Sequence, residues 1–213
     1  MVPPGADPAT FPVDPCLLAA KMTDDAVLGY HTALEFHGRA HSAFERFFYL
    51  TARRSVSVTF RSHQFRCVLF ANALRAEGQQ NFGVMQAERA GVDVRVSSLE
   101  RTLVDVLDRP ELGGGWEEIW RSLESVEFFD LDTVVQYALL LRNATTVAKV
   151  GFFLHQHRDA LMVDDAHLQP LREHRPKQPH YLARSDRKSG RLVAKWNLVV
   201  PVEVLEQAWA VVT

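Results

Sequence analysis

The period of the apolar residues changes twice along this chain of 213 residues, and that order limits the fold more than any single motif does. Residues 14–38 carry apolar side chains at the 3.6-residue spacing of helices, whereas residues 47–96 alternate or run apolar as strands do. The helical spacing returns after Val96. Strands gathered in one block predict an α+β fold rather than alternating βαβ units. We expect N-terminal helices, an antiparallel β meander, a helical region and a C-terminal β-hairpin.

Short polar residues before apolar runs indicate where the helices begin. Asp14 followed by Pro15 predicts the start of a short helix, and Thr23 predicts a second helix over residues 26–36 that ends at Gly38. Ser97 and Glu100 have the spacing of a capping box at the start of a helix that must end before Pro110. Later helix starts are expected at Asp130 or Asp132, at Thr145 or Thr146, and at Asp164.

Four or five strands are expected in the middle of the chain. Apolar or alternating runs cover residues 47–51, 56–60, 65–69, 82–87 and 92–96, with turns near residues 62–64 and 90–91. Residues 181–183 and 192–200 predict the terminal hairpin, with its turn at residues 185–190. The run of three glycines at residues 113–115 is typical of a flexible connector between two helices.

Composition and charge exclude several classes of protein. Hydrophobic residues make up 47% and charged residues 23% of the chain, which is usual for a globular protein, and the net charge is only −2. The two cysteines lack metal-ligand spacing, and the first fifteen residues, which contain five prolines, lack the features of a secretory signal. No apolar run approaches the length of a membrane span. We expect a cytoplasmic protein with no membrane association, an extended arm over residues 1–13, and one domain over residues 14–213.

Catalytic motifs are missing from the sequence. The glycine run has no lysine or hydroxyl partner for a phosphate loop, no Gly-x-Ser-x-Gly elbow occurs, and the nine histidines include no His-Glu-x-x-His. We therefore expect a binding protein rather than an enzyme, without a cofactor or a bound metal.

Three polar residues, Glu100, Arg101 and Asp105, are the leading candidates for an anchored polar site. Arg101 and Asp105 are four residues apart and can pair across one helical turn. One interpretation is a capping residue beside an ion pair on the helix surface. In the other, Asp105 fixes Arg101 so that its guanidinium is presented to a carboxylate or phosphate.

Basic residues cluster in two stretches although the total charge is near zero. Residues 39–75 hold seven arginines and one acid, and residues 172–195 hold eight basic residues and two acids. In the first stretch the arginines are mixed with phenylalanines and a tyrosine, a combination that can bind nucleic acids by phosphate contacts and stacking. The alternative is that the aromatic residues face the core and the arginines only solvate the outer face. The candidate nucleic-acid contacts are Arg53, Arg54, Arg61, Arg184, Arg187 and Lys188.

Two neighbouring segments resemble the central signature of the AbiEi-type antitoxins. Residues 94–105 read VRVSSLERTLVD and are similar to the family's valine–serine–x–x–glutamate–arginine–threonine–leucine–x–aspartate helix. Residues 108–114 read DRPELGG and are similar to its arginine–proline–glutamate–leucine–x–glycine–glycine segment. Residues 17–38 and 196–201 resemble the flanking histidine–glycine helix and the terminal strand that contains tryptophan. The resemblance covers about residues 14–201.

The resemblance implies an antitoxin-like regulatory protein that acts by binding a macromolecule. AbiEi-type proteins are the antitoxins of bacterial abortive-infection systems, described as type IV toxin–antitoxin systems. They repress their own promoters, and the partner toxin is a nucleotidyltransferase. A typical member has a winged helix-turn-helix before the domain needed for antitoxicity. About fourteen residues precede the similar region here, too few for a winged helix, so the resemblance implies either an effector domain that stands alone or one whose upstream part lies outside this sequence.

Two other functions stay open at this point. A small nuclease or nucleotide-handling enzyme could use Glu100, Asp105 and a histidine such as His31 for acid–base or metal chemistry. A protein–protein docking module could use the acidic helical region, because residues 98–132 hold ten acids and three arginines.

Overall fold

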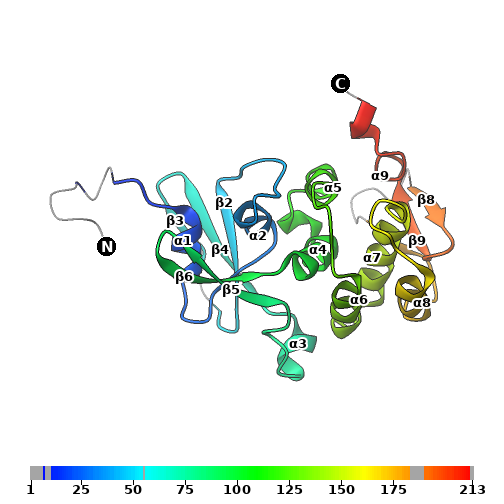
Figure 1. Ribbon diagram of the computed structural model, residues 1–213, viewed down its shortest axis with the longest axis horizontal. Coiled ribbons are helices and arrows are strands. Elements are labelled where there is room, and N and C mark those ends of the chain that lie inside the picture. The colour runs from blue at the N-terminus through cyan, green and yellow to red at the C-terminus, as the bar shows by residue number, and fades with distance from the viewer. Residues whose placement is uncertain (1–6, 8–10, 55, 183–189, 212–213) are drawn as a thin grey trace.

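The computed structural model describes residues 7, 11–54, 56–182 and 190–211, and it has the expected α+β architecture. Figure 1 shows a sheet at one end of the molecule and helices followed by a small second sheet at the other. Of the predicted N-terminal arm, only residues 7 and 11–13 are described. Among the described residues, no helix combines the length and apolarity needed to cross a membrane.

The larger sheet has six strands in the order β3-β4-β2-β1-β6-β5. It is mixed, so the prediction of an antiparallel meander was wrong: β2 runs parallel to β4, and β1 runs parallel to β6. β3 is short and has exposed residues, which suits an outer edge of the sheet. β4 has buried side chains on both faces, so it lies between β3 and β2 and pairs with β2 in parallel. Strand bounds are β1 Val27–Leu28, β2 Arg46–Thr51, β3 Val58–Phe60, β4 His63–Leu69, β5 Val84–Arg89 and β6 Val92–Ser97.

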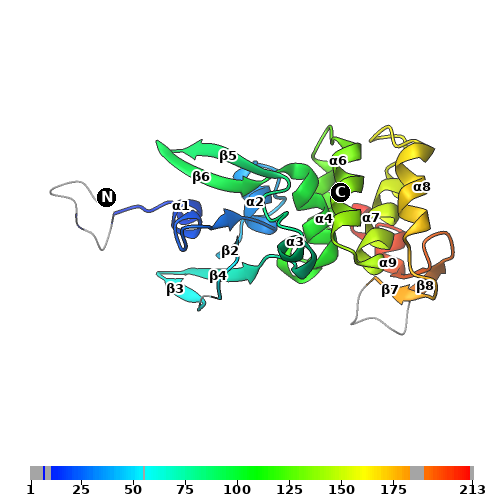
Figure 2. The ribbon, with the colours of Figure 1, turned by 90° about the horizontal axis from the view of Figure 1, so that it is seen from below.

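The segment predicted as a helix over residues 26–36 divides into β1 and a shorter helix, α2 (His31–Phe36). Val27 and Leu28 are fully buried, and they belong to different apolar clusters on the two faces of the sheet. Only an extended backbone sends consecutive side chains to opposite faces in this way. Helix α1 (Pro15–Ala20) begins as predicted, with the Asp14 side chain accepting a hydrogen bond from the Cys16 N–H. In Figure 2, α1 and α2 lie between the β5–β6 and β3–β4 arms of the curved sheet.

Five further helices and one 3₁₀ turn follow the sheet, and a short helix, α3 (Asn72–Ala76), lies within its connections. Asp164 is an N-cap as predicted, and of the two candidates Asp130 and Asp132 the N-cap is Asp130. Asn143 caps the helix that was expected to start at Thr145 or Thr146, so that prediction was wrong. The predicted capping box is also corrected: Ser97 ends β6 and Ser98 is the N-cap. The bounds are α4 Leu99–Asp108, η1 Pro110–Leu112, α5 Trp116–Glu124, α6 Leu131–Leu140, α7 Ala144–Gln156 and α8 Asp165–Glu173.

The smaller sheet has the order β7-β9-β8, with β7 His180–Tyr181, β8 Gly190–Val193 and β9 Leu198–Pro201. The hairpin therefore joins β8 to β9, whereas β7, the strand predicted to form it, runs parallel to β9. The predicted turn over residues 185–190 lies outside the described residues except for Gly190. The chain continues through α9 (Val202–Leu205) and a 3₁₀ turn, η2 (Ala208–Val211).

One apolar cluster connects the two parts of the molecule. It extends from Leu50 in the large sheet through Leu103 and Trp120 to Phe153 and Trp196 beside the small sheet. A second cluster packs α1 against the other face of the large sheet. Helix α1 therefore covers one face of the sheet. The opposite face packs against the helices at one end, and its outer end is uncovered.

Candidate functional site

Arg101 and Asp105 form a buried network rather than a site on the surface. The side chain of Arg101 is only 1% exposed, and its Nε donates to Asp105 Oδ2 at 3.3 Å. Its Nη1 donates to the main-chain oxygens of Gln80 at 2.8 Å and Phe82 at 2.7 Å. Two interpretations were open for Arg101, an ion pair on the helix surface and a guanidinium presented to a ligand. Both are wrong, because this face of α4 is buried in the core. Arg101 is anchored as expected, but it ties α4 to the segment before β5.

Tyr137 on α6 completes this network from the opposite side. Its hydroxyl donates to Asp105 Oδ1 at 2.7 Å, and its ring lies under the Arg101 guanidinium, 5.2 Å from Cζ. Burial, with the Asp105 charge second, raises the pKa of Tyr137 well above its usual value, so the phenol stays protonated and keeps donating. Glu100 lies apart from this group and accepts from the Asp130 N–H at 3.4 Å. Glu100 therefore links α4 to the start of α6 instead of closing a capping box.

The residues predicted to contact nucleic acid do not form one patch. Arg53 and Arg54 are exposed after the C-terminal end of β2, whereas Arg61 is exposed in the turn before β4. Because β2 and β4 are parallel, these positions lie at opposite ends of the strands, about 20 Å apart for six extended residues. Arg184, Arg187 and Lys188 lie outside the described residues.

Two other arginines, Arg46 and Arg66, lie together on one face of the large sheet. The register pairs Arg46 with Gln64 and Phe48 with Arg66, and alternation along each strand puts all four on the same face. Both arginines are exposed, and neither forms an ion pair within residues 7, 11–54, 56–182 and 190–211. They are uncompensated cations on the open end of this face.

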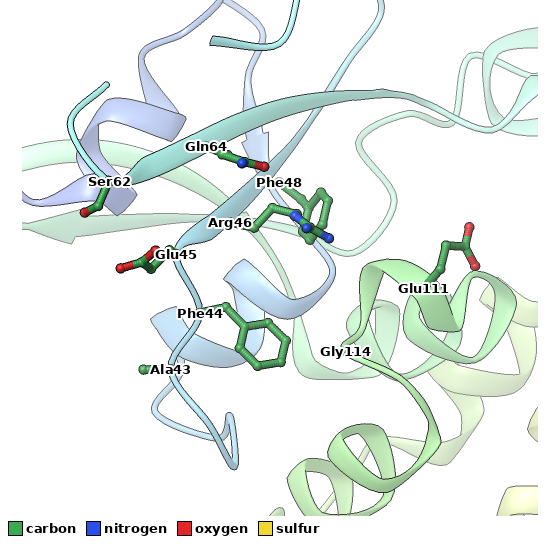
Figure 3. A pocket seen from close by; sticks show the side chains of 9 residues that line it. All are labelled: Ala43, Phe44, Glu45, Arg46, Phe48, Ser62, Gln64, Glu111 and Gly114. Carbon is green, nitrogen blue, oxygen red and sulfur yellow. The ribbon is translucent and has the colours of Figure 1, made fainter. Parts of the chain in front are cut away.

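Arg46 lines a cavity of about 430 Å³, which we call the arginine pocket. One wall consists of residues 43–46 and 48 with Ser62 and Gln64, and the other consists of Glu111 and Gly114. In Figure 3 the guanidinium of Arg46 points into the space between Phe48 and Gly114, whereas the carboxylate of Glu45 points away from it. The pocket thus joins the first basic stretch to the segment that resembles the antitoxin signature.

Phe44 is fixed in this wall by a buried histidine. The rings of Phe44 and His31 are stacked, with centroids 3.9 Å apart and an interplanar angle of 10°. His31 Nε2 lies 3.0 Å from Glu118 Oε1, and the same oxygen accepts from the Ser42 N–H at 3.0 Å. Glu35 accepts from the Phe44 N–H at 2.8 Å. Burial opposes ionisation of Glu118, but the hydrogen bonds from Ser42 and His31 lower its pKa below the usual value.

Gly113 and Gly114 are closely packed, so the prediction of a flexible connector is wrong for them, whereas Gly115 has open space where a Cβ would lie. Gly114 has φ +92°, and a Cβ there would come within 2.7 Å of both the Phe44 ring and Glu118 Cγ. A Cβ on Gly113 would come within 2.8 Å of Ile119. Only glycine permits this approach of the loop to α5 and to residues 42–44.

A larger cleft of about 840 Å³ lies on the other side of η1, and Glu111 lines both cavities. Its charged groups already have partners. Arg109 Nε donates to Glu111 at 3.3 Å, and Lys149 Nζ donates to the Asp108 main-chain oxygen at 3.2 Å. The Asp108 carboxylate accepts from Asn143 and from the Thr146 hydroxyl at the start of α7. These contacts stabilise the junction of α4 and α7, whereas Arg46 in the arginine pocket has no ion-pair partner among the residues that the structure describes.

The residues of the enzyme hypothesis are engaged separately. Asp105 is bound by Arg101 and Tyr137, Glu100 by the Asp130 N–H, and His31 by Glu118. Within the part of the chain that the structure describes, no group of three or more His, Cys, Asp and Glu residues is arranged to hold a metal ion.

The comparisons with known proteins give a likeness of fold. No family model matches this chain, and no curated protein matches it. The crystal structure of the RV2827C protein from Mycobacterium tuberculosis is similar, with a TM-score of 0.59 and 14% sequence identity over 92% of this chain and 71% of that chain. At this identity the similarity supports the α+β fold and carries no activity over to this chain.

Proposed function

We propose that this chain is an antitoxin-like regulatory domain that acts by binding the phosphate backbone of a nucleic acid at the arginine pocket. One observation carries the proposal. The basic stretch and the Pro110–Gly115 segment, two independent signals in the sequence, form the two walls of one cavity.

The chemistry of the pocket suits a phosphate backbone. Arg46 in the pocket and Arg66, which lies on the same sheet face outside it, are exposed without carboxylate partners among the described residues, so contact with phosphates would release counterions instead of breaking ion pairs. Ser62 and Gln64 offer uncharged hydrogen-bonding groups beside them, as phosphate and sugar contacts in nucleic-acid complexes do. Phe44 adds an aromatic side chain held in place by His31.

Binding to short fluorescent nucleic acids tests this proposal. We expect single-stranded RNA, single-stranded DNA or duplex DNA to bind at low salt, with an affinity that falls steeply as salt rises. The double variant Arg46→Ala/Arg66→Ala should weaken binding and reduce the slope of log K against log salt by about 1 for each phosphate that the variant no longer neutralises. Fluorescence anisotropy across a salt series measures both quantities.

The matched control removes the same charge from the far end of β2. Arg53→Ala/Arg54→Ala lowers the net charge equally but leaves the arginine pocket intact, so its affinity and salt slope should stay close to those of the unaltered chain. Equally weakened binding by the two double variants would mean that only overall charge matters. Absence of binding by the unaltered chain at low salt would remove the nucleic-acid assignment.

The antitoxin assignment needs a separate measurement. The resemblance predicts that a nucleotidyltransferase is encoded beside this chain and that coexpression of the two restores growth inhibited by the toxin alone. Failure of rescue with a soluble, folded chain would remove the antitoxin assignment and leave the binding measurement unaffected.

A further inference from the structure

An apolar groove with acidic residues lies between the C-terminal ends of α5 and α7. Its cavity measures about 360 Å³, and it shares no lining residue with the arginine pocket. Leu123 and Val126 line one side, and Phe153, Ala160 and Leu161 line the other. Such a volume lies within the usual range for ligand sites, about 300–1,000 Å³, and therefore accepts a bulky apolar side chain.

Two large apolar residues next to this groove remain exposed. Phe128 is 67% exposed and follows the lining residue Glu127, and Met162 is 72% exposed and follows the lining residue Leu161. Met162 also has φ +54°, a left-handed conformation that side-chain-bearing residues seldom adopt. Exposed apolar residues beside an apolar groove are typical of an interaction surface.

The carboxylates of the groove indicate the charge that a partner must carry. Glu127 lines the groove and Asp159 precedes the lining residue Ala160, and neither carboxylate has a partner among the described residues. Glu124 accepts from His157 at 2.9 Å. Of the neighbouring cations, Arg158 pairs with Asp165, whereas Arg39 donates to the neutral main-chain oxygen of Ser125 and keeps its positive charge. Among the described residues, the two unpaired carboxylates of Glu127 and Asp159 outnumber the one positive charge of Arg39, and this excess of negative charge fits a basic partner.

The secondary structure around the groove indicates which conformation a bound peptide adopts. Its lining residues belong to the ends of two helices and to the turns that follow them, and none belongs to a strand. A bound peptide therefore finds no strand edge with which to pair its main chain, and a helix, which satisfies its own main-chain hydrogen bonds, is the conformation that fits.

We propose that this groove, which we call the acidic groove, binds an amphipathic helix of another protein, with an apolar anchor in the cavity and Lys or Arg side chains beside Glu127 and Asp159. The surface lies outside the arginine pocket, and its occupant does not depend on the nucleic-acid proposal.

A pair of designed helical peptides of about 16 residues tests the acidic groove. Both carry Leu and Phe on one face at i, i+3 and i+7, and they differ only in having Lys or Glu at the remaining charged positions. We expect the lysine peptide to bind the full chain and the glutamate peptide not to bind, as measured by anisotropy of a labelled peptide. Phe128→Ser/Met162→Ser should weaken the lysine peptide at least about tenfold.

Two further variants distinguish specific docking from general stickiness. Glu127→Lys should weaken the lysine peptide and strengthen the glutamate peptide, whereas Met85→Ser, which removes a 47%-exposed side chain from β5, should change neither. Equal binding of both peptides, no binding of either, or an equal effect of Met85→Ser would overturn the proposal. A concentration-dependent dimer that Phe128→Ser abolishes would overturn it in favour of a second copy of this chain.

Discussion

At the scale of single residues, the arginines of this protein differ in what surrounds the guanidinium. Arg101 lies inside the core, and two main-chain oxygens, one carboxylate and the Tyr137 ring occupy its surroundings. Arg46 and Arg66 lie on an open sheet face without an ion pair among the described residues. A buried guanidinium stabilises the fold through the groups that it already contacts, while an exposed and uncompensated one is available to a partner.

The residue-scale prediction concerns Arg101. Replacing it by Met leaves the Asp105 carboxylate buried without its counter-charge, and breaking a buried pair in this way costs about 3–5 kcal/mol. Arg109→Met, which breaks the exposed pair with Glu111, should cost less than about 1 kcal/mol. Chemical denaturation followed by circular dichroism measures both free energies of unfolding. An Arg101→Met chain as stable as the unaltered one, but deficient in nucleic-acid binding, would instead give this residue a direct role in binding.

At the scale of the elements, local signals fix helix starts, whereas the pairing of strands depends on distant contacts. Asp14 and Asp164 could be predicted as caps, and Asp130 as one of two candidates, because a cap depends only on local sequence: the side chain accepts from an N–H two or three residues later. Strand β1 could not be predicted, because the conformation of its two residues depends on pairing with β2 on one side and with β6 on the other. The parallel pairing of β2 with β4 likewise has no local signature.

The candidate site follows the same division. The basic stretch and the glycine run could be identified from the sequence, since both are local in composition. Their meeting in one pocket depends on tertiary packing, and so does the selection of Arg46 rather than Arg53, which needs the strand register. The burial of Arg101 could not be predicted, because helical spacing alone does not show which face of α4 is covered by Gln80 and Phe82.

The prediction at the scale of the elements concerns Glu118, which links α5 to residues 42–44, the segment that positions Phe44. Glu118 has a lowered pKa in the folded state, so its contribution to stability is present above its usual value of 4.5 and is lost as pH falls through the folded value. Glu118→Gln should therefore reduce the free energy of unfolding by about 1–3 kcal/mol near neutral pH. The difference from the unaltered chain should shrink below about pH 4.5.

Urea unfolding between pH 3 and about pH 7 measures this dependence, and the neighbouring residue supplies the control. Glu117 is mostly exposed and pairs with Arg121, so Glu117→Gln should change the stability by less than about 0.5 kcal/mol at every pH. A difference between Glu118→Gln and the unaltered chain that grows towards acidic pH would contradict the assigned hydrogen bonds.

At the scale of the whole molecule, the sheet and the helices share one core. The apolar cluster runs without interruption from Val27 and Leu50 in the sheet to Trp120 on α5 and Phe153 on α7. Arg101 and Asp105 bind across the same boundary, from α4 to the segment before β5 and to α6. Both walls of the arginine pocket therefore depend on one packed interior, since one wall comes from β2, β4 and the loops that precede them and the other from η1 and a glycine that follows it.

The shared core predicts that the whole chain unfolds in a single cooperative transition. All four tryptophans lie between residues 116 and 209, so their fluorescence reports only the helices and the smaller sheet. The buried amides of β2 report the large sheet through hydrogen exchange. We expect the opening free energy of the β2 amides to equal the unfolding free energy obtained from tryptophan fluorescence, because neither part can keep its half of the core when the other opens. A lower value for β2, or two transitions on heating, would mean that the sheet opens independently, and the arginine pocket would then lose one wall before the protein unfolds.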